Sequence, residues 1–169
     1  MFKPRRLYFV ALLLAFTITA RTQEPLKLPY YDILFREVAR FQADASAIEK
    51  NGGSAEYLRR HHQRKLGLRD QDAATLVSVA RSYISSIAPL DKQASEIIQS
   101  AKSRFRANPK NGSVPKPPAI LQTLQVQKNA TIQSCIEALR SSFGDATFTW
   151  IDSNIRAYIK RGSENTRKE

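Results

Sequence analysis

The chain has 169 residues, with 27 Lys and Arg against 15 Asp and Glu, which gives a formal net charge of +12. A protein this basic favours anionic partners such as membrane lipid, acidic polymers or acidic proteins, and charge alone does not choose among them. The single cysteine, Cys135, excludes an intramolecular disulfide, so an apolar core must stabilise the fold.

The first twenty residues have the three-part pattern of a secretory signal peptide. Lys3, Arg5 and Arg6 precede an uncharged, mostly apolar run over residues 7–20, which is shorter than the roughly 20 residues of a membrane-spanning helix. We expect export to the periplasm or the extracellular space, with cleavage near the small residue Ala20. The alternative is an uncleaved anchor, because Ile18 is bulkier than the residue usual at that point of a cleavage site.

Removal of residues 1–20 leaves 149 residues with a formal charge of +9, enough for one domain. The lack of disulfides fits a bacterial periplasmic protein better than a small secreted domain. Residues 21–29 contain Pro25 and Pro29 without apolar periodicity, which predicts an extended lead-in. A single α-helical domain is then expected over residues 30–160, followed by a charged tail over 161–169.

The first predicted helix is amphipathic, and Gly52 and Gly53 end it. Its apolar residues step by three and four: Tyr31, Leu34, Val38, Phe41, Ala45 and Ile48. Ser54 is expected to cap a short second helix that extends to Leu66 and ends at Gly67.

The longest periodic stretch covers residues 70–107 and predicts one long helix, capped by Asp70 or Asp72. Two apolar rows run along it: one of Ala73, Val77, Ala80, Ile84, Ile87, Ala94, Ile98, Ala101 and Phe105, and one of Leu76, Tyr83, Leu90 and Ile97. Pro89 lies inside this stretch, where a proline removes one hydrogen bond and bends a helix. Either one kinked helix results, with Asp91 where the kink opens the stripe to water, or Asp91 caps a second, separate helix.

The proline-rich stretch over residues 107–118 predicts a loop, after which residues 119–143 form a helix antiparallel to the long one. Gly144 ends that helix, and Asp145 caps a last one with Phe148, Ile151, Ile155 and Ile159 on one face. No stretch alternates with period two. We therefore predict an all-α fold, a helical hairpin or small bundle of about five helices built on one long kinked helix.

The densest basic patch lies on the short second helix and just beyond its end, and its members are the candidate anion-binding or partner-binding residues: Arg59, Arg60, Arg64, Lys65 and Arg69. The alternative is an ordinary solvated helix face. His61 and His62 point about 100° apart on a helix, so they are poorly placed to bind one metal ion, and no metal site is predicted.

No pattern of catalytic residues occurs in the sequence, so we expect neither an enzyme nor a cofactor. Cys135 is in phase with Ile132 and Leu139, which favours a core thiol, and Trp150 is expected at the edge of the core. Tyr57 is the only aromatic residue near the basic patch, which argues against nucleic-acid binding.

One resemblance adds to this interpretation. The signal peptide, the basic helical body and the run Leu66-Gly67-Leu68 before a capped long helix resemble the LTXXQ family of periplasmic helical proteins, the Spy and CpxP type. Arg69 and Asp72 stand where the family motif has threonine and glutamine. The resemblance implies an all-helical hairpin with a concave basic surface that holds unfolded clients or senses envelope stress.

The leading hypothesis from the sequence is therefore an exported, non-enzymatic helical protein that binds anionic or partly unfolded partners through a basic surface. A membrane surface is a further possible partner, and the oligomeric state is left open. The alternative is a scaffold protein of the cell envelope whose helices pack against copies of themselves.

Overall fold

The computed structural model describes residues 28–107 and 116–165, and this part of the chain contains six helices and no strand. They are α1 (Leu28–Lys50), α2 (Glu56–Arg59), α3 (His61–Leu66), α4 (Asp70–Ala107), α5 (Ala119–Phe143) and α6 (Asp145–Asn165). The predicted all-α fold is confirmed. The predicted signal peptide, most of the lead-in, the middle of the proline-rich loop and residues 166–169 lie outside the described residues.

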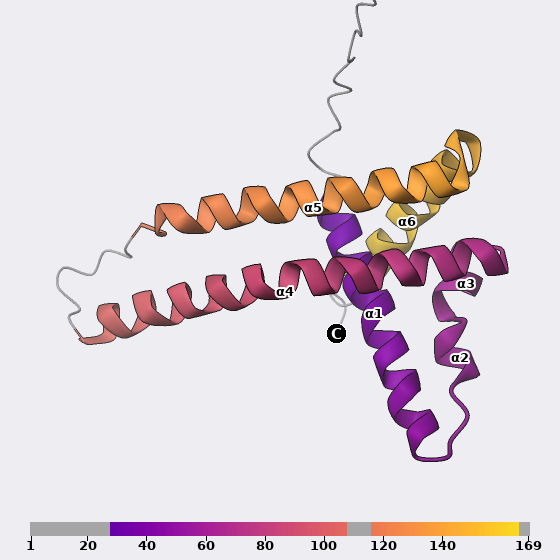
Figure 1. Cartoon of the computed structure of the whole chain (residues 1–169), viewed down its shortest axis with the longest axis horizontal. Coiled ribbons are helices and arrows are strands. Elements are labelled where there is room, and N and C mark those ends of the chain that lie inside the picture. Colours follow the sequence, from indigo (N-terminus) through magenta and orange to yellow (C-terminus); the bar gives the residue numbers. More distant parts are fainter. Residues whose placement is uncertain (1–27, 108–115, 166–169) are drawn as a thin grey trace, which may run out of the picture.

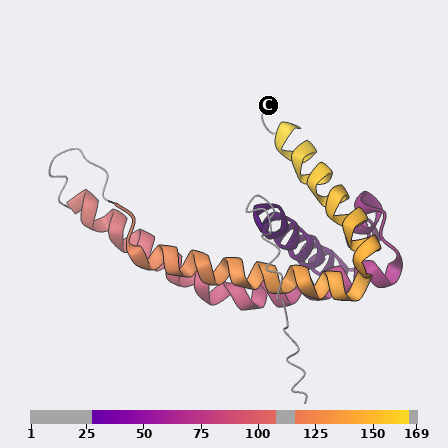
Figure 2. The same cartoon turned by 90° about the horizontal axis from the view of Figure 1, so that it is seen from above.

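A long antiparallel hairpin of α4 and α5 is the frame of the molecule (Figure 1). α1 crosses one half of this hairpin, and α2, α3 and α6 gather around the same half (Figures 1 and 2). The other half extends away from them as a pair of helices (Figure 2), which meets α1 only at its inner end, through Asp91 and Lys128. We call the helix-covered half the body and the other half the arm, which comprises residues 90–105 of α4 and residues 116–128.

The core lies almost wholly in the body. Its largest fully buried side chains come from α1, α3, α4, α5 and α6: Tyr31, Phe35, Leu34, Val38, Leu66, Tyr83, Ile87, Ile132, Leu139, Ile151 and Ile155. On α4 the buried apolar positions are Leu76, Ala80, Tyr83 and Ile87, at a spacing of four, three and four. No described α4 side chain beyond Ile87 is buried, although the apolar stripe continues to Phe105.

α4 is continuous through Pro89, so one helix, not two, forms this element. Figure 2 shows the hairpin curving along its length. Asp91 neither caps a second helix nor faces only water, because its Oδ2 accepts a hydrogen bond from Arg36 of α1 at 2.7 Å. An acidic residue on the apolar stripe is therefore explained by a partner on the crossing helix.

Asp32 of α1 ties three helices together. Its carboxylate accepts hydrogen bonds from Tyr83 of α4 at 2.6 Å, Lys128 of α5 at 2.6 Å and Arg36 of its own helix at 2.7 Å. Burial opposes ionisation of this group, but the three donors outweigh it and lower the pKa of the Asp32 carboxyl. We call Asp32 and its three donors the Asp32 hub, and it lies where the body meets the arm.

Three predicted boundaries are wrong. α1 begins at Leu28, inside the predicted lead-in, because a proline such as Pro29 is well tolerated in a first helical turn, where its missing N–H has no partner to lose. The short second helix is two helices broken at Arg60, and Ser54 does not cap them, since Ala55 holds the N-cap position without a side-chain bond. α6 continues to Asn165, into the predicted tail, because the single Gly162 costs a helix only about 1 kcal/mol.

The glycines predicted to end helices do so, but the aspartates predicted to cap α4 and α6 lie inside these helices. Arg69 and Gly144 precede the two helices instead, and their carbonyls accept the first helical hydrogen bonds, from Ala73 and Phe148. Gly67 has a left-handed backbone, with φ of 64°, at the end of α3, and Gly144 follows α5 with φ of 76°. Asp70 is the first residue of α4, and Asp72 lies in its first turn. None of the helices in the described residues has the length and hydropathy needed to cross a membrane.

Candidate functional site

The predicted basic patch on α2 and α3 is largely neutralised by carboxylates. Arg59 pairs with Glu49 of α1 and also donates to the Gln42 side chain at 2.7 Å. Arg60 pairs with Glu56 at 3.1 Å. Arg69 donates to Asp72, which is buried, at 2.7 Å. The charge of each of these three candidates is therefore compensated by a neighbouring acid.

Arg64 and Lys65 are the two members of the patch that remain exposed without a carboxylate partner among the described residues. The Arg64 guanidinium lies over the Tyr57 ring, 5.6 Å from its centroid. The structure thus brings all five predicted residues to one region, but only these two lack a compensating carboxylate among the described residues.

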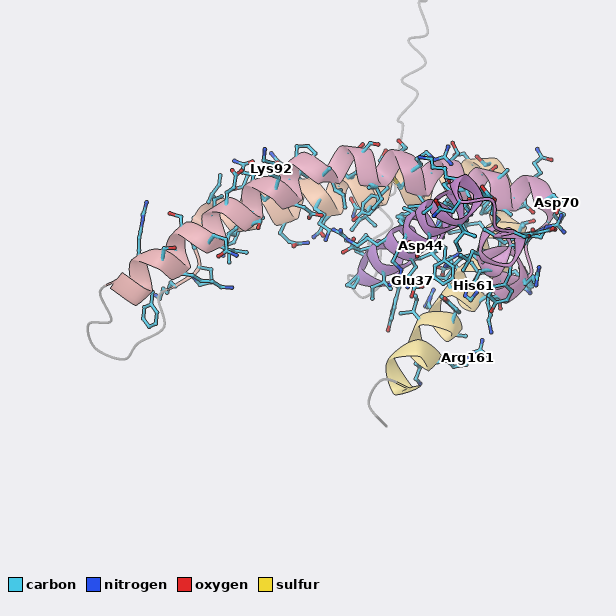
Figure 3. All side chains as sticks on the ribbon, turned by 90° about the horizontal axis from the view of Figure 1, so that it is seen from below. Glu37, Asp44, His61, Asp70, Lys92 and Arg161 are labelled. Carbon is cyan, nitrogen blue, oxygen red and sulfur yellow. The ribbon has the colours of Figure 1, made fainter. Side chains whose placement is uncertain are left out.

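The two histidines belong to a packed aromatic cluster. His61 stacks on Phe41 with ring centroids 4.5 Å apart, and His62 is 5% exposed with its Nε2 atom 3.8 Å from Glu37 Oε2. Neither of these two atoms has a hydrogen-bond partner. Burial, and then the charges of His61 and Arg40, lower the pKa of His62 to about 4. His62 is therefore neutral at pH 7. Figure 3 shows that Glu37 and His61 lie in the body, far from Lys92 on the arm.

The described residues contain no group of three His, Cys, Asp or Glu side chains placed to hold a metal ion. Cys135 is half-buried against the core, and burial raises the pKa of its thiol. Trp150 is more exposed than predicted, at 52%, and its ring lies against Gly67. These residues form no constellation for acid–base or nucleophilic chemistry.

The arm carries an apolar groove between its two helices. Two adjoining hollows, of about 280 and 210 Å³, share Ile98 and Leu121 as lining residues. The outer one is lined by Ile98, Ala101, Lys102, Phe105, Lys116, Pro117, Pro118 and Leu121. The inner one is lined by Leu90, Asp91, Ala94, Ile98, Leu121, Leu124, Gln125 and Lys128. Together they form a shallow channel along α4 from Leu90 to Phe105, which spans roughly 22 Å at about 1.5 Å per residue.

The inner end of this arm groove is the place where α1 docks on the hairpin. Asp91 and Lys128, which line the inner hollow, are the residues that pair with Arg36 and Asp32 of α1. Beyond them the described chain provides no further element to cover the groove (Figures 1 and 2). The groove therefore continues a helix-binding surface that α1 uses only at its inner end.

The arm is also strongly positive. It contains five basic residues against Asp91 and Glu96, and both Asp91 and Lys128 are engaged by α1. Lys102 and Lys116 lie at the outer hollow, and neither has an ion-pair partner among the residues of the helices and the segments between them that the structure describes. A positive, apolar and uncovered surface is thus concentrated here.

The arm is not among the candidate sites predicted from the sequence, although the sequence contains a signal for it. Residues 97–136 contain no Asp or Glu and six Lys and Arg, a run of forty residues with one sign of charge. The basic patch near His61 was predicted as the binding site because its charges are adjacent in sequence. Three of its five basic residues instead pair with Glu49, Glu56 and Asp72. The pair with Glu49 joins α2 to α1 and is not apparent from the sequence.

A third hollow, of about 470 Å³, lies between α1 and α4 in the body. Arg81 is its only charged lining residue, and the others are small, apolar or neutral: Ala39, Gln42, Ala43, Ser46, Val77, Ile84 and Ser85. Two of them, Gln42 and Ser46, already accept hydrogen bonds from Arg59. This cleft therefore offers one guanidinium and little else for recognition.

Comparison with known proteins finds no family model, no curated protein and no solved structure that matches this chain.

Proposed function

We propose that this chain is an exported, non-enzymatic binding protein that holds anionic or partly unfolded polypeptides on the basic, apolar surface of its arm. The observation that carries the proposal is the uncovered arm groove, with Ile98 and Leu121 along its floor and Lys102 and Lys116 at its outer end. Partly unfolded chains expose apolar side chains, which such a groove shields from water. The lysines attract the acidic segments of the same partners.

The test is suppression of aggregation by the chain from residue 21 onward. A chemically denatured reporter enzyme is diluted into buffer with this protein, and light scattering is followed at low and at high salt. We expect delayed aggregation that weakens with salt, and a larger loss for Lys102→Glu with Lys116→Glu than for Arg60→Glu with Arg64→Glu. The proposal fails if the protein neither delays aggregation nor retains any partner at low salt.

Self-association is the second candidate function, because the arm exposes large apolar side chains. Ile98, Ile120 and Val126 are 38%, 43% and 66% exposed. Two arms packed side by side would bury these residues but would bring positive charge against positive charge. Light scattering at rising protein concentration separates the two candidates, since a monomer at all concentrations excludes the scaffold.

A further inference from the structure

The chain shows how a helix is held at the inner end of the arm groove. α1 places apolar side chains against the hairpin, Phe35 against Tyr83 with ring centroids 5.1 Å apart, while its Asp32 receives the Lys128 ammonium. An apolar stripe with a flanking carboxylate is therefore the chemistry that this surface accepts. The rest of the groove offers the same combination of apolar floor and flanking lysines without an occupant in the described chain.

The dimensions favour a polypeptide helix over a small molecule. Each hollow is smaller than the roughly 300–1,000 Å³ of ordinary ligand pockets, and both are partly open to solvent. A channel of roughly 22 Å matches a helix of about 15 residues, whose apolar side chains at i, i+4 and i+7 would enter successive hollows.

We infer that the arm groove binds an amphipathic helix of a partner polypeptide, with an apolar stripe on the floor formed by Ile98 and Leu121 and with Asp or Glu side chains at Lys102 and Lys116. This inference deepens the proposed function and rests on it, because it names the conformation and the charge of the segment that the arm holds. The occupant is acidic because the outer hollow is lined by two lysines, Lys102 and Lys116, and by no carboxylate.

The test uses a fluorescent synthetic peptide of 16 residues, with leucines on one helical face and glutamates beside them, and a matched peptide with lysines in place of the glutamates. We expect the acidic peptide to bind, to gain helical circular dichroism on binding, and to bind at least tenfold more tightly than the basic one at low salt. Lys102→Glu with Lys116→Glu should reduce the affinity at least tenfold. The matched control, Arg64→Glu with Lys65→Glu, makes the same charge change on α3 and should change it less than twofold.

A second variant tests the apolar floor. Ile98 is 38% exposed, so Ile98→Asp adds a charge to the groove without opening the buried core, and it should also abolish peptide binding while circular dichroism of the protein is retained. Equal loss in the Lys102/Lys116 and Arg64/Lys65 variants overturns the inference. Binding to vesicles of anionic phospholipid but not to the peptide overturns it in favour of a membrane surface, and a dimer that Ile98→Asp dissociates overturns it in favour of a second copy.

The two proposals fail differently. If the unmodified protein delays aggregation of the reporter, and Ile98→Asp and the lysine variant lose this activity, while no peptide binds, the further inference is wrong and the proposed function stands. If the unmodified protein neither delays aggregation nor binds the peptide, both are wrong.

Discussion

Tyr31 and Asp152 form a buried polar contact between the first and last helices. The Tyr31 hydroxyl donates to Asp152 Oδ1 at 2.8 Å, and Asp152 is additionally paired with Arg156. Burial and the Asp152 carboxylate raise the pKa of the tyrosine well above its usual range, so the hydroxyl is protonated and donates at every ordinary pH.

Tyr31→Phe should lower the free energy of unfolding by about 1–3 kcal/mol, because it removes the buried hydrogen bond that the Tyr31 hydroxyl donates to Asp152. Urea unfolding measures this loss. Tyr57→Phe is the control: Tyr57 is 62% exposed, and its hydroxyl removal should change stability by less than about 0.5 kcal/mol. Equal effects of the two substitutions would contradict the role assigned to the buried hydrogen bond.

His62 makes stability depend on pH. Its pKa is about 4 in the folded protein against 6.5 for an ordinary histidine, so the unfolded chain binds more protons between these values. Stability should therefore fall as the pH drops from about 6.5 to about 4, by at most about 3 kcal/mol, from the size of the shift. The groups that face the imidazole are Glu37, His61, Arg40 and Tyr158, and of these only the Glu37 carboxylate opposes the fall.

The measurement is urea unfolding of the wild type and of His62→Phe at several pH values between 7.5 and 4.5. The difference between the two free energies isolates His62, because all other titrating groups are shared. A difference that does not change with pH would show that Glu37 compensates the imidazolium completely.

At the scale of elements, the Asp32 hub fixes how α1 crosses the hairpin. Asp32→Asn should lower the free energy of unfolding by about 2–3 kcal/mol at pH 7, since Lys128 and Arg36 then lose a charged acceptor. Because the pKa of Asp32 is lowered in the folded state, this contribution is present above the ordinary carboxyl pKa and is lost as the pH falls through the lowered one. Asp44→Asn on the exposed side of the same helix is the control, and thermal unfolding of both variants at pH 7 is the measurement.

Pro89 interrupts the hydrogen bonding of α4 where the arm begins. Pro89→Ala should straighten the hairpin and give only a small net change in melting temperature. In a helix interior, replacing proline by alanine stabilises the helix by about 3 kcal/mol. However, α5 packs against the bent form of α4, and misfit packing against a straightened helix costs about 1–3 kcal/mol. Small-angle X-ray scattering should show a longer maximum dimension, and an unchanged scattering curve would mean that curvature does not depend on the proline.

The sequence predicts a helix and its ends correctly where the signal lies in neighbouring residues. Gly67, Gly144 and the periodic stretch from Asp70 to Ala107 place their elements correctly, because a left-handed cap and an apolar period are properties of neighbouring residues. The break at Arg60 was not predictable in this way. It depends on α2 and α3 packing against α1, through contacts such as that of Arg59 with Glu49.

The candidate site was less predictable than the fold for the same reason. Asp91 looked anomalous on the apolar stripe until Arg36 of another helix supplied its partner. Conversely, the apolar stripe of α4 predicts burial equally on both sides of Pro89, and only the three-dimensional arrangement shows that Ile98 remains uncovered while Ile87 is enclosed. Periodicity identifies the face of a helix but not whether another element covers it.

At the scale of the whole molecule, the body and the arm should differ in local stability although they share the same two helices. The body half of α4 buries Leu76, Ala80, Tyr83 and Ile87, whereas no described side chain of its arm half is buried. Hydrogen exchange should be at least tenfold faster for amides at residues 94–104 than at residues 76–87. Uniform protection along α4 in the isolated protein would indicate that something covers the arm, and adding the acidic peptide should slow exchange in the arm alone.

The contact of Trp150 with Gly67 gives the molecule an internal optical reporter. Trp150 is the only tryptophan in the sequence and is 52% exposed. Its ring lies against Gly67, which closely follows Arg64 and Lys65 in the chain. Its helix, α6, belongs to the body and lies away from the arm (Figures 1 and 2). Its fluorescence emission and its quenching by acrylamide should change when a ligand covers the α3 surface and stay constant when a ligand occupies the arm. A fluorescence titration of the unlabelled, unmodified protein can therefore distinguish a partner that binds the basic surface of α3 from one that binds the arm.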